Sequence, residues 1–230
     1  MSEMLSGSVF FGVMISILAY ELGMFLKKKT NLAICNPLLI SIIVVMIALA
    51  VLDIDYETYK QGANLLSYLL TPATVCLAIP LYEKLTLLKQ NVKAIMAGIV
   101  SGVLTSLISI LVMALIFGLS HEEYVTLLPK SITTAIGMGV SEEMGGIVTI
   151  TVAVILITGV LGNVIGETVC KIFRIHEPIA VGLSFGTASH AIGTSKALEL
   201  GEIQGAMSSL SIAVAGLLTV IGASVFANFY

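Results

Sequence analysis

The sequence contains several long apolar runs with no charged residue, and these runs limit what the chain can fold into. The run from Leu38 to Leu52 has one hydroxyl, at Ser41, and no charge. A membrane-spanning helix needs about 20 predominantly apolar residues, whereas the strands of a membrane β-barrel alternate apolar and polar residues. The continuous runs therefore predict an all-α, polytopic helical membrane protein.

The composition supports the same conclusion. Of the 230 residues, 57% are hydrophobic and 11% are charged, against roughly 25% charged residues in soluble domains. The net charge is -3, so the chain has no basic surplus with which to neutralise nucleic-acid phosphates. The three cysteines are scattered and predict no disulfide framework. The expected partner is the lipid bilayer, and nucleic acid is excluded.

Six stretches have the length and apolarity of full spans, and two more apolar regions are interrupted. The interrupted regions, 125–141 and 178–195, are shorter and rich in Gly, Ser and Thr, so we expect broken or re-entrant helices there. Lys27–Lys29 follow the first run, and the positive-inside rule places them in the cytoplasm and the N-terminus outside. The expected full spans are 5–26, 34–52, 62–82, 94–118, 145–166 and 203–227.

An internal two-fold repeat is one interpretation of a single transmembrane domain over 1–230. A shift of about 115 residues brings Thr71-Pro72-Ala73-Thr74 onto Gly186-Thr187-Ala188-Ser189. Repeats over 1–115 and 116–230 would follow the pattern of transporters, in which paired broken segments meet at the substrate site. The alternative is chance similarity, because apolar sequences align with each other easily.

The first segment that carries chemistry begins at Pro129 and Lys130. Proline suits the first turn of a helix, and exposed N–H groups at a helix N-terminus favour an anion. Ser131, Thr133 and Thr134 add hydroxyls, so the segment predicts half of a carboxylate or phosphate site. In the alternative, Lys130 extends to the lipid headgroups and the hydroxyls bond their own backbone.

The second segment, 182–196, combines small residues, hydroxyls and one histidine within an apolar region. A helix can break in such a stretch and expose polar backbone to a cavity. His190 or Glu199 would couple a proton; alternatively, His190 bonds a neighbouring helix, and Lys196 pairs with Glu199 at i, i+3. The candidate substrate-binding residues here are Thr187, Ser189, His190, Gly193, Thr194 and Lys196.

The third segment has two prolines eight residues apart in one expected span. Proline removes a backbone donor, so the segment predicts a discontinuous helix that lines the pathway; the alternative is a kinked packing helix. The residues concerned are Thr71, Pro72, Thr74 and Pro80.

No enzymatic activity, metal or cofactor is expected from the sequence. Gly182-Leu183-Ser184-Phe185-Gly186 matches the G-x-S-x-G pattern of serine hydrolases, but that motif needs a strand-to-helix elbow in an α/β sheet. The three histidines and three cysteines are too scattered for a metal site.

Three motifs together resemble the LrgB/CidB family of bacterial membrane proteins, and the resemblance covers essentially the whole chain. Two departures are Ala135, where the family usually has Pro, and Ser195-Lys196, where it usually has Ala-Arg. Lysine keeps the charge of arginine but loses its two-pronged hydrogen bonding. The motifs are NLLSYLLTPATVCLAIPLYEKL at 64–85, PKSITTAIGM at 129–138 and GTASHAIGTSKALELGE at 186–202.

The resemblance implies two functions. One is secondary transport of small α-hydroxy or α-keto monocarboxylates, such as pyruvate, glycolate or glycerate, with a small holin-like partner of the LrgA/CidA type; plastidial relatives exchange glycolate and glycerate. The other is antiholin-like regulation of murein hydrolase activity and cell lysis, without transport. Either function implies a multi-pass protein of the bacterial inner membrane. In the transport reading, Lys130, helped by Lys196, neutralises the carboxylate. We also expect a homodimer, because short segments bury little surface within one chain.

Overall fold

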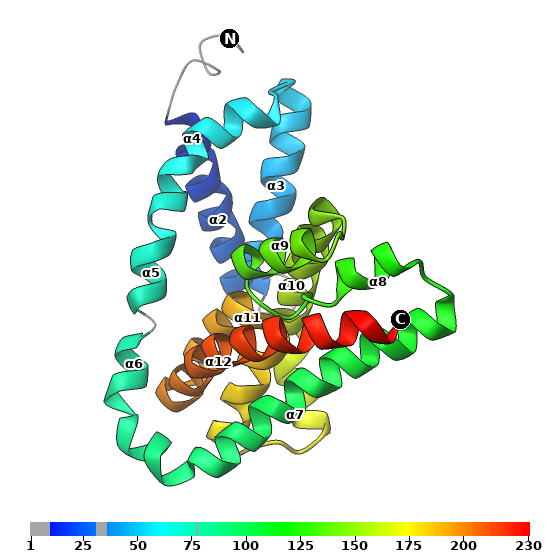
Figure 1. Cartoon of the computed structure of the whole chain (residues 1–230). Coiled ribbons are helices and arrows are strands. Elements are labelled where there is room, and N and C mark those ends of the chain that lie inside the picture. Colours follow the sequence, from blue (N-terminus) through cyan, green and yellow to red (C-terminus); the bar gives the residue numbers. More distant parts are fainter. Residues whose placement is uncertain (1–9, 31–35, 77) are drawn as a thin grey trace. The chain divides into compact units, whose positions relative to one another are not determined.

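The computed structural model describes residues 10–30, 36–76 and 78–230, and every regular element in these ranges is a helix (Figure 1). The prediction of an all-α membrane protein is confirmed. The chain divides into two compact units, Met1–Cys76 and Leu77–Tyr230. This division does not test the proposed repeats over 1–115 and 116–230, which stay a prediction.

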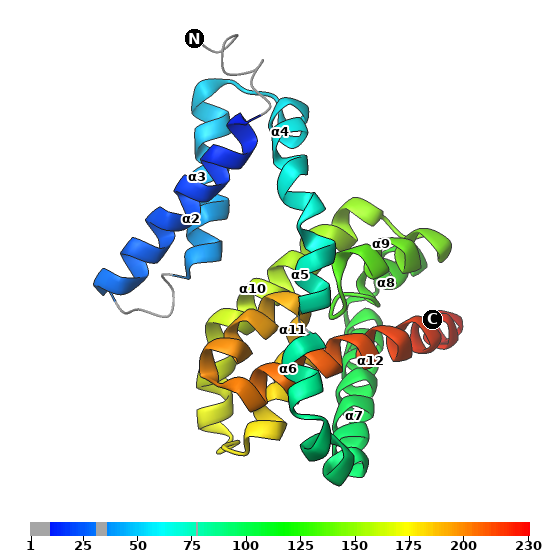
Figure 2. The ribbon, with the colours of Figure 1, turned by 90° about the vertical axis from the view of Figure 1, so that its left-hand side faces the viewer.

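The first unit is built around α2, which packs against both α3 and α4. Figure 2 shows α2 and α3 side by side. Small residues permit this close approach: a Cβ on Gly23 of α2 would lie 2.7 Å from the Pro37 carbonyl oxygen at the start of α3. The bounds are α2 (Phe11–Thr30), α3 (Pro37–Leu52), α4 (Tyr56–Tyr68) and α5 (Leu70–Cys76).

The stretch 62–82, expected as one span, is not covered by a single helix. It is divided among the end of α4, α5 and, in the second unit, α6 (Ala78–Glu83), while residue 77 lies outside the described ranges. Pro72 and Pro80 are each the third residue of their short helix, where the missing N–H has no intrahelical partner to lose. A proline further into a helix would remove a backbone hydrogen bond between residues i and i−4. Each of these prolines therefore favours a helix that starts only a few residues before it.

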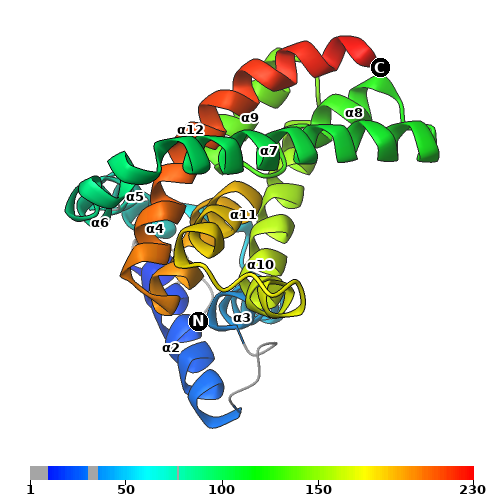
Figure 3. The same ribbon diagram turned by 90° about the horizontal axis from the view of Figure 1, so that it is seen from below.

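In the second unit, α11 lies between α10 and α12, and α7 packs against α11 and α12 (Figure 3). Among the described residues, three helices are long and apolar enough to cross a membrane: α7, α10 and α12. They correspond to the expected spans 94–118, 145–166 and 203–227. The bounds are α7 (Leu85–Phe117), α8 (His121–Leu127), α9 (Thr134–Glu143), α10 (Val148–Ile172), α11 (Pro178–Leu200), α12 (Glu202–Phe226) and η1 (Ala227–Phe229).

Both regions that were expected to be interrupted are interrupted. In 125–141, α8 ends at Leu127 and α9 begins at Thr134, with an irregular connection between them. In 178–195, Ser189 and His190 leave helical geometry inside α11, and His190 has a φ of 43°. A non-glycine residue with positive φ is uncommon and costs conformational energy, so the surroundings must hold this break in place.

Polar contacts outside the candidate spans hold helix ends in the second unit. Ser120 and Glu123 form a reciprocal capping box at the start of α8, and hydrogen bonding from Ser120 lowers the pKa of the Glu123 carboxyl. The Lys84 ammonium lies 2.8 Å from Glu202, and this hydrogen bond raises the pKa of Lys84. The pair joins the start of α7 to the start of α12.

Glycines form the contact between α11 and α12. A Cβ on Gly182 would lie 2.8 Å from the Met207 Cβ, and a Cβ on Gly186 would collide with the Ser208 carbonyl oxygen and the Ser211 hydroxyl. The Gly182-x-x-x-Gly186 pattern therefore acts as a helix-packing motif.

We predict that Gly186→Ala destabilises the protein by about 1–3 kcal/mol, because the added methyl group overpacks a backbone contact. The matched control is Gly139→Ala in α9, where an added Cβ meets no atom within 4 Å and helix propensity improves. Thermal unfolding in detergent, followed by circular dichroism, should show a lower midpoint for Gly186→Ala alone. Equal midpoints for both variants would contradict this account of the contact.

Candidate functional site

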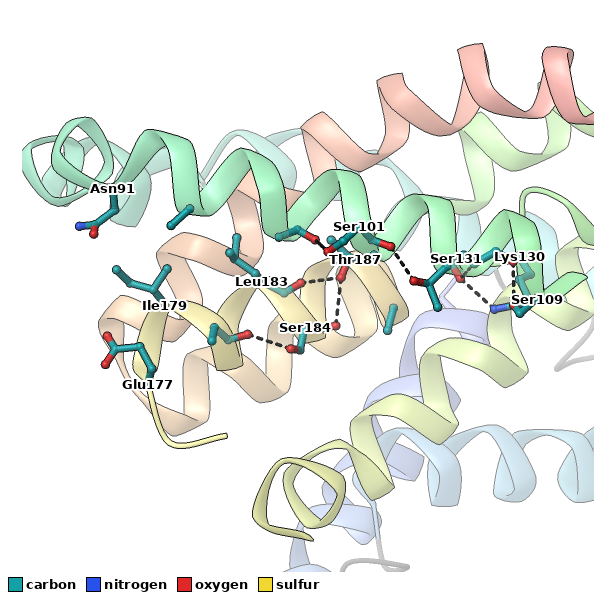
Figure 4. Close-up of a pocket in the computed structure, with 17 residues that line it drawn as sticks. Asn91, Ser101, Ser109, Lys130, Ser131, Glu177, Ile179, Leu183, Ser184 and Thr187 are labelled. Carbon is teal, nitrogen blue, oxygen red and sulfur yellow. Dashed lines mark hydrogen bonds between the residues drawn. The ribbon is translucent and has the colours of Figure 1, made fainter. Parts of the chain in front are cut away.

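A cavity of about 720 Å³ lies within the second unit, between α7, the first half of α11 and the connection from α8 to α9 (Figure 4). Its volume is in the range of about 300–1,000 Å³ that is typical of small-molecule sites. The connection contributes Lys130 and Ser131, and α11 contributes Ser184 and Thr187. The cavity therefore brings together three residues that the sequence predicted for substrate binding: Lys130, Ser131 and Thr187.

One face of α7 forms the long wall of the cavity. Its small residues recur at spacings of three and four, which places them on one face of a helix. A Cβ on Gly98 would lie 3.0 Å from Leu183, and one on Gly102 would lie 3.1 Å from Thr187, so α7 and α11 touch at these glycines. The residues of this face that line the cavity are Gly98, Ser101, Gly102, Thr105, Ser106 and Ser109.

Sequence reasoning missed the hydroxyls of this wall. Ser101, Ser106 and Ser109 lie within a long apolar helix, and none of them was among the candidate residues. The available signal was the helical spacing of polar residues within an otherwise apolar span, which predicts a polar face.

Lys130 marks one end of the cavity. Its ammonium donates to the Ser131 hydroxyl at 3.1 Å, and that hydroxyl lies 3.2 Å from the Ser106 hydroxyl of α7. Among the described residues, no carboxylate lies within 4 Å of the partly buried Lys130 ammonium. Figure 4 shows Lys130, Ser131 and Ser109 at this end and Asn91 and Glu177 at the other. The Lys130 end is thus the electropositive end of the cavity.

The other candidates of the first segment lie beside the cavity rather than in its lining. Thr133 is the N-cap residue of α9 but makes no side-chain capping bond, and Thr134 is the first residue of that helix. Both side chains are partly exposed. Of the residues predicted for the anion site in this first segment, Lys130 and Ser131 line the cavity, and Thr133 and Thr134 do not.

The break in α11 is buried against α10. The His190 ring nitrogen Nε2 lies 3.0 Å from the Ile155 carbonyl oxygen, and a Cβ on Gly159 would lie 2.7 Å from the ring. Ser189 packs against Gly162 in the same way. His190 therefore bonds a neighbouring helix, which was the alternative to proton coupling in the sequence analysis.

Hydrogen bonds from side chains support the backbone around this break. The Asn163 amide of α10 donates to the Ile192 carbonyl at 2.7 Å and to the Ser195 hydroxyl at 3.0 Å. Thr194 donates to the His190 carbonyl at 3.0 Å and lies 2.7 Å from the Ser208 hydroxyl of α12. Ser189, His190, Gly193 and Thr194 are buried and do not belong to the lining of the cavity.

Lys196 belongs to an ionic cluster between α10 and α11 instead of the cavity. Its ammonium lies 3.3 Å from Glu167 and 3.2 Å from Glu199, and Glu167 also pairs with Lys171 at 2.7 Å. Two carboxylates therefore compensate the charge of Lys196. Sequence reasoning included the Lys196–Glu199 pair as an alternative but missed Glu167; the signal was a carboxylate four residues before Lys171.

Among the side chains that the structure describes, none from the third predicted segment lines this cavity. Pro72 lies in α5 of the first unit, whereas Pro80 lies in α6 of the second. The side chains of Thr71, Thr74 and Pro80 lie outside the described part of the structure. Their expected role in lining a pathway stays a prediction.

Comparison with known proteins extends across both units. The model of the LrgB-like family matches residues 16–229. The chain belongs to the LrgB family. Antiholin-like protein LrgB of Bacillus mycoides (strain KBAB4) is 34% identical, and that of Bacillus cereus (strain B4264) is 35% identical, each over 96% of both chains. No solved structure matches the chain. The resemblance read from the three motifs is confirmed.

We predict that Asn163→Leu destabilises the break in α11, since it removes both donors and leaves the Ile192 carbonyl without this partner. The expected loss is about 1–3 kcal/mol in the free energy of unfolding. Asn228→Leu is the control, because Asn228 is exposed and its amide donates to the Ser224 carbonyl four residues earlier in the chain. Amide hydrogen exchange of 189–195 should accelerate in Asn163→Leu; unchanged exchange would refute the supporting role.

Proposed function

We propose that the chain is a secondary transporter of a small α-hydroxy or α-keto monocarboxylate. The main support for this proposal is the Lys130 end of the cavity, where a cation with no carboxylate of the described residues within 4 Å lies beside hydroxyls. A charge in a membrane protein is costly unless it is paired or faces a cavity, and a substrate carboxylate would supply the missing partner. Ser131 and Thr187 are the further candidates that line the same cavity.

The remaining candidates take other roles in this proposal. Ser189, Gly193 and Thr194 preserve the break in α11, and Lys196 holds α11 to α10 through Glu167. Proton coupling through His190 or Glu199 stays part of the proposal, as do the inner membrane, the outside N-terminus and the homodimer. Lys27–Lys29 lie in the last turn of α2, which suits the proposed orientation.

The second candidate is an antiholin-like regulator of murein hydrolase activity and lysis, acting with a holin-like partner of the LrgA/CidA type. The comparisons favour this candidate more directly than transport, because the curated relatives are named antiholin-like proteins. It requires a surface for the partner but no solute in the cavity. The two candidates therefore differ in whether the function requires the charge of Lys130.

We predict that Lys130→Met abolishes uptake of labelled pyruvate or lactate into proteoliposomes. Leaving a buried carboxylate without its charge partner costs about 2–5 kcal/mol, so uptake should fall by more than about 30-fold. Lys171→Met is the matched control, since Lys171 lies at the exposed end of α10 and pairs with Glu167. Its uptake should be close to that of the unchanged protein.

Three results would decide between the candidates. Uptake that persists in Lys130→Met would remove Lys130 from the site. Absence of uptake of pyruvate, lactate and glycolate by the unchanged protein, with and without a holin-like partner, would overturn transport of these short acids, and absence of gluconate uptake as well would overturn transport of monocarboxylates. A change in cell lysis on expression that is equal for the unchanged protein and Lys130→Met would then support the regulatory candidate.

A further inference from the structure

Three of the four hydroxyls of the α7 wall that line the cavity donate their protons to the backbone of their own helix, and the fourth, of Ser106, contacts the Ser131 hydroxyl. Ser101 donates to the Gly98 carbonyl at 2.9 Å, Thr105 to the Ser101 carbonyl at 2.7 Å, and Ser109 to the Ser106 carbonyl at 2.8 Å. A hydroxyl has one proton and two lone pairs. These three groups therefore present hydrogen-bond acceptors to the cavity.

The facing wall repeats this arrangement. Ser184 of α11 donates to the Ala180 carbonyl at 2.8 Å, and Thr187 donates to the Leu183 carbonyl at 2.7 Å. Both line the cavity. The two walls thus offer acceptors, whereas the charged donor, the Lys130 ammonium, lies at one end.

The acceptors also form a ladder. Ser101, Thr105 and Ser109 are spaced four residues apart and are exposed, so the ladder runs along the open wall for about 12 Å at 1.5 Å per residue. A three-carbon acid has the bulk of roughly three water molecules, or about 90 Å³, and the cavity has about 720 Å³. Such an acid, held at Lys130, would leave most of the ladder unused.

The charges orient a longer ligand. Lys130 and Glu177 line opposite ends of the cavity (Figure 4). A carboxylate is attracted to the Lys130 end and repelled from the Glu177 end, so the rest of the ligand extends along the two walls. Ligand groups that lie along the walls face the hydrogen-bond acceptors of α7 and α11. Ligand hydroxyls can donate to these acceptors, whereas keto oxygens and methylenes cannot.

We infer that the cavity accepts a carboxylate whose chain is longer than three carbons and carries several hydroxyl groups. The inference rests on the proposed carboxylate site at Lys130 and narrows its substrate class. The carboxylate binds Lys130, and the hydroxyls donate to Thr105, Ser101 and the facing hydroxyls of α11.

Binding of three probes to the full chain in lipid nanodiscs, measured by calorimetry, tests the inference. Gluconate has six carbons and five hydroxyls, hexanoate has the same length without hydroxyls, and lactate is short. Gluconate should bind at least about tenfold more tightly than either, since two or more added hydrogen bonds each contribute about 1 kcal/mol.

Substitutions in the wall separate the acceptors from general packing. Thr105→Val keeps the shape but removes the acceptor, so gluconate affinity should fall about fivefold while lactate and hexanoate affinities stay unchanged. Thr105→Ser keeps the acceptor and should behave like the unchanged protein. Ser101→Ala should resemble Thr105→Val. Ser224→Ala is its control, because Ser224 also bonds its own helix but does not line the cavity.

Each contrary result has a distinct meaning. If hexanoate binds as tightly as gluconate, the hydroxyl acceptors do not select the ligand. If lactate binds as tightly as gluconate, the inferred preference for a chain longer than three carbons is wrong. Both results leave the Lys130 site intact. If none of the three carboxylates binds, or if binding survives Lys130→Met, the proposed site fails and this inference fails with it.

Discussion

The close packing of α11 against three neighbours is the constraint on which the second unit depends. Glycines make each contact: Gly182 and Gly186 of α11 face α12, Gly102 of α7 faces Thr187, and Gly162 of α10 faces Ser189. In a bilayer, lipid tails are as apolar as leucine, so helices associate mainly through such packing and through hydrogen bonds between helices. A side chain at any of these positions would separate α11 from a neighbour.

The same packing explains how α11 tolerates a break. A non-helical backbone within a membrane is tolerated only where its polar groups are satisfied by protein or face water. The Asn163 amide and the Thr194 hydroxyl supply bonds to the carbonyls of Ile192 and His190. These groups reach the backbone because glycines of α10 and of α11 itself let the helices approach so closely. The buried Thr194 hydroxyl, a substrate ligand in the sequence prediction, thus bonds the backbone in this structure.

Much of the fold could be predicted from the sequence, because uncharged apolar runs in a chain of this composition have few structural solutions. The runs that became α7, α10 and α12 and the interruptions at 125–141 and 178–195 were predicted. The stretch 62–82 had two descriptions from the sequence, one span by its apolarity and a discontinuous helix by its prolines, because apolarity alone does not tell whether a helix continues past Pro72 and Pro80; the structure divides it among α4, α5 and α6. The hydroxyl wall of α7 was missed because hydropathy averages over all faces of a helix.

The candidate site was harder to predict because a charge is defined by its neighbours, which the sequence does not place. Lys130 and Lys196 both lie beside hydroxyls in interrupted apolar segments, and apart from the spacing of Lys196 and Glu199 nothing in the sequence distinguishes them. In the structure, Lys196 meets Glu167, 29 positions earlier in the chain, as well as Glu199. The Lys130 ammonium meets the hydroxyl of Ser131 and an open cavity. Lys196 has its counter-charges within the protein, whereas Lys130 faces the cavity, and this difference is the reason why the proposed anion site is at Lys130 and not at Lys196.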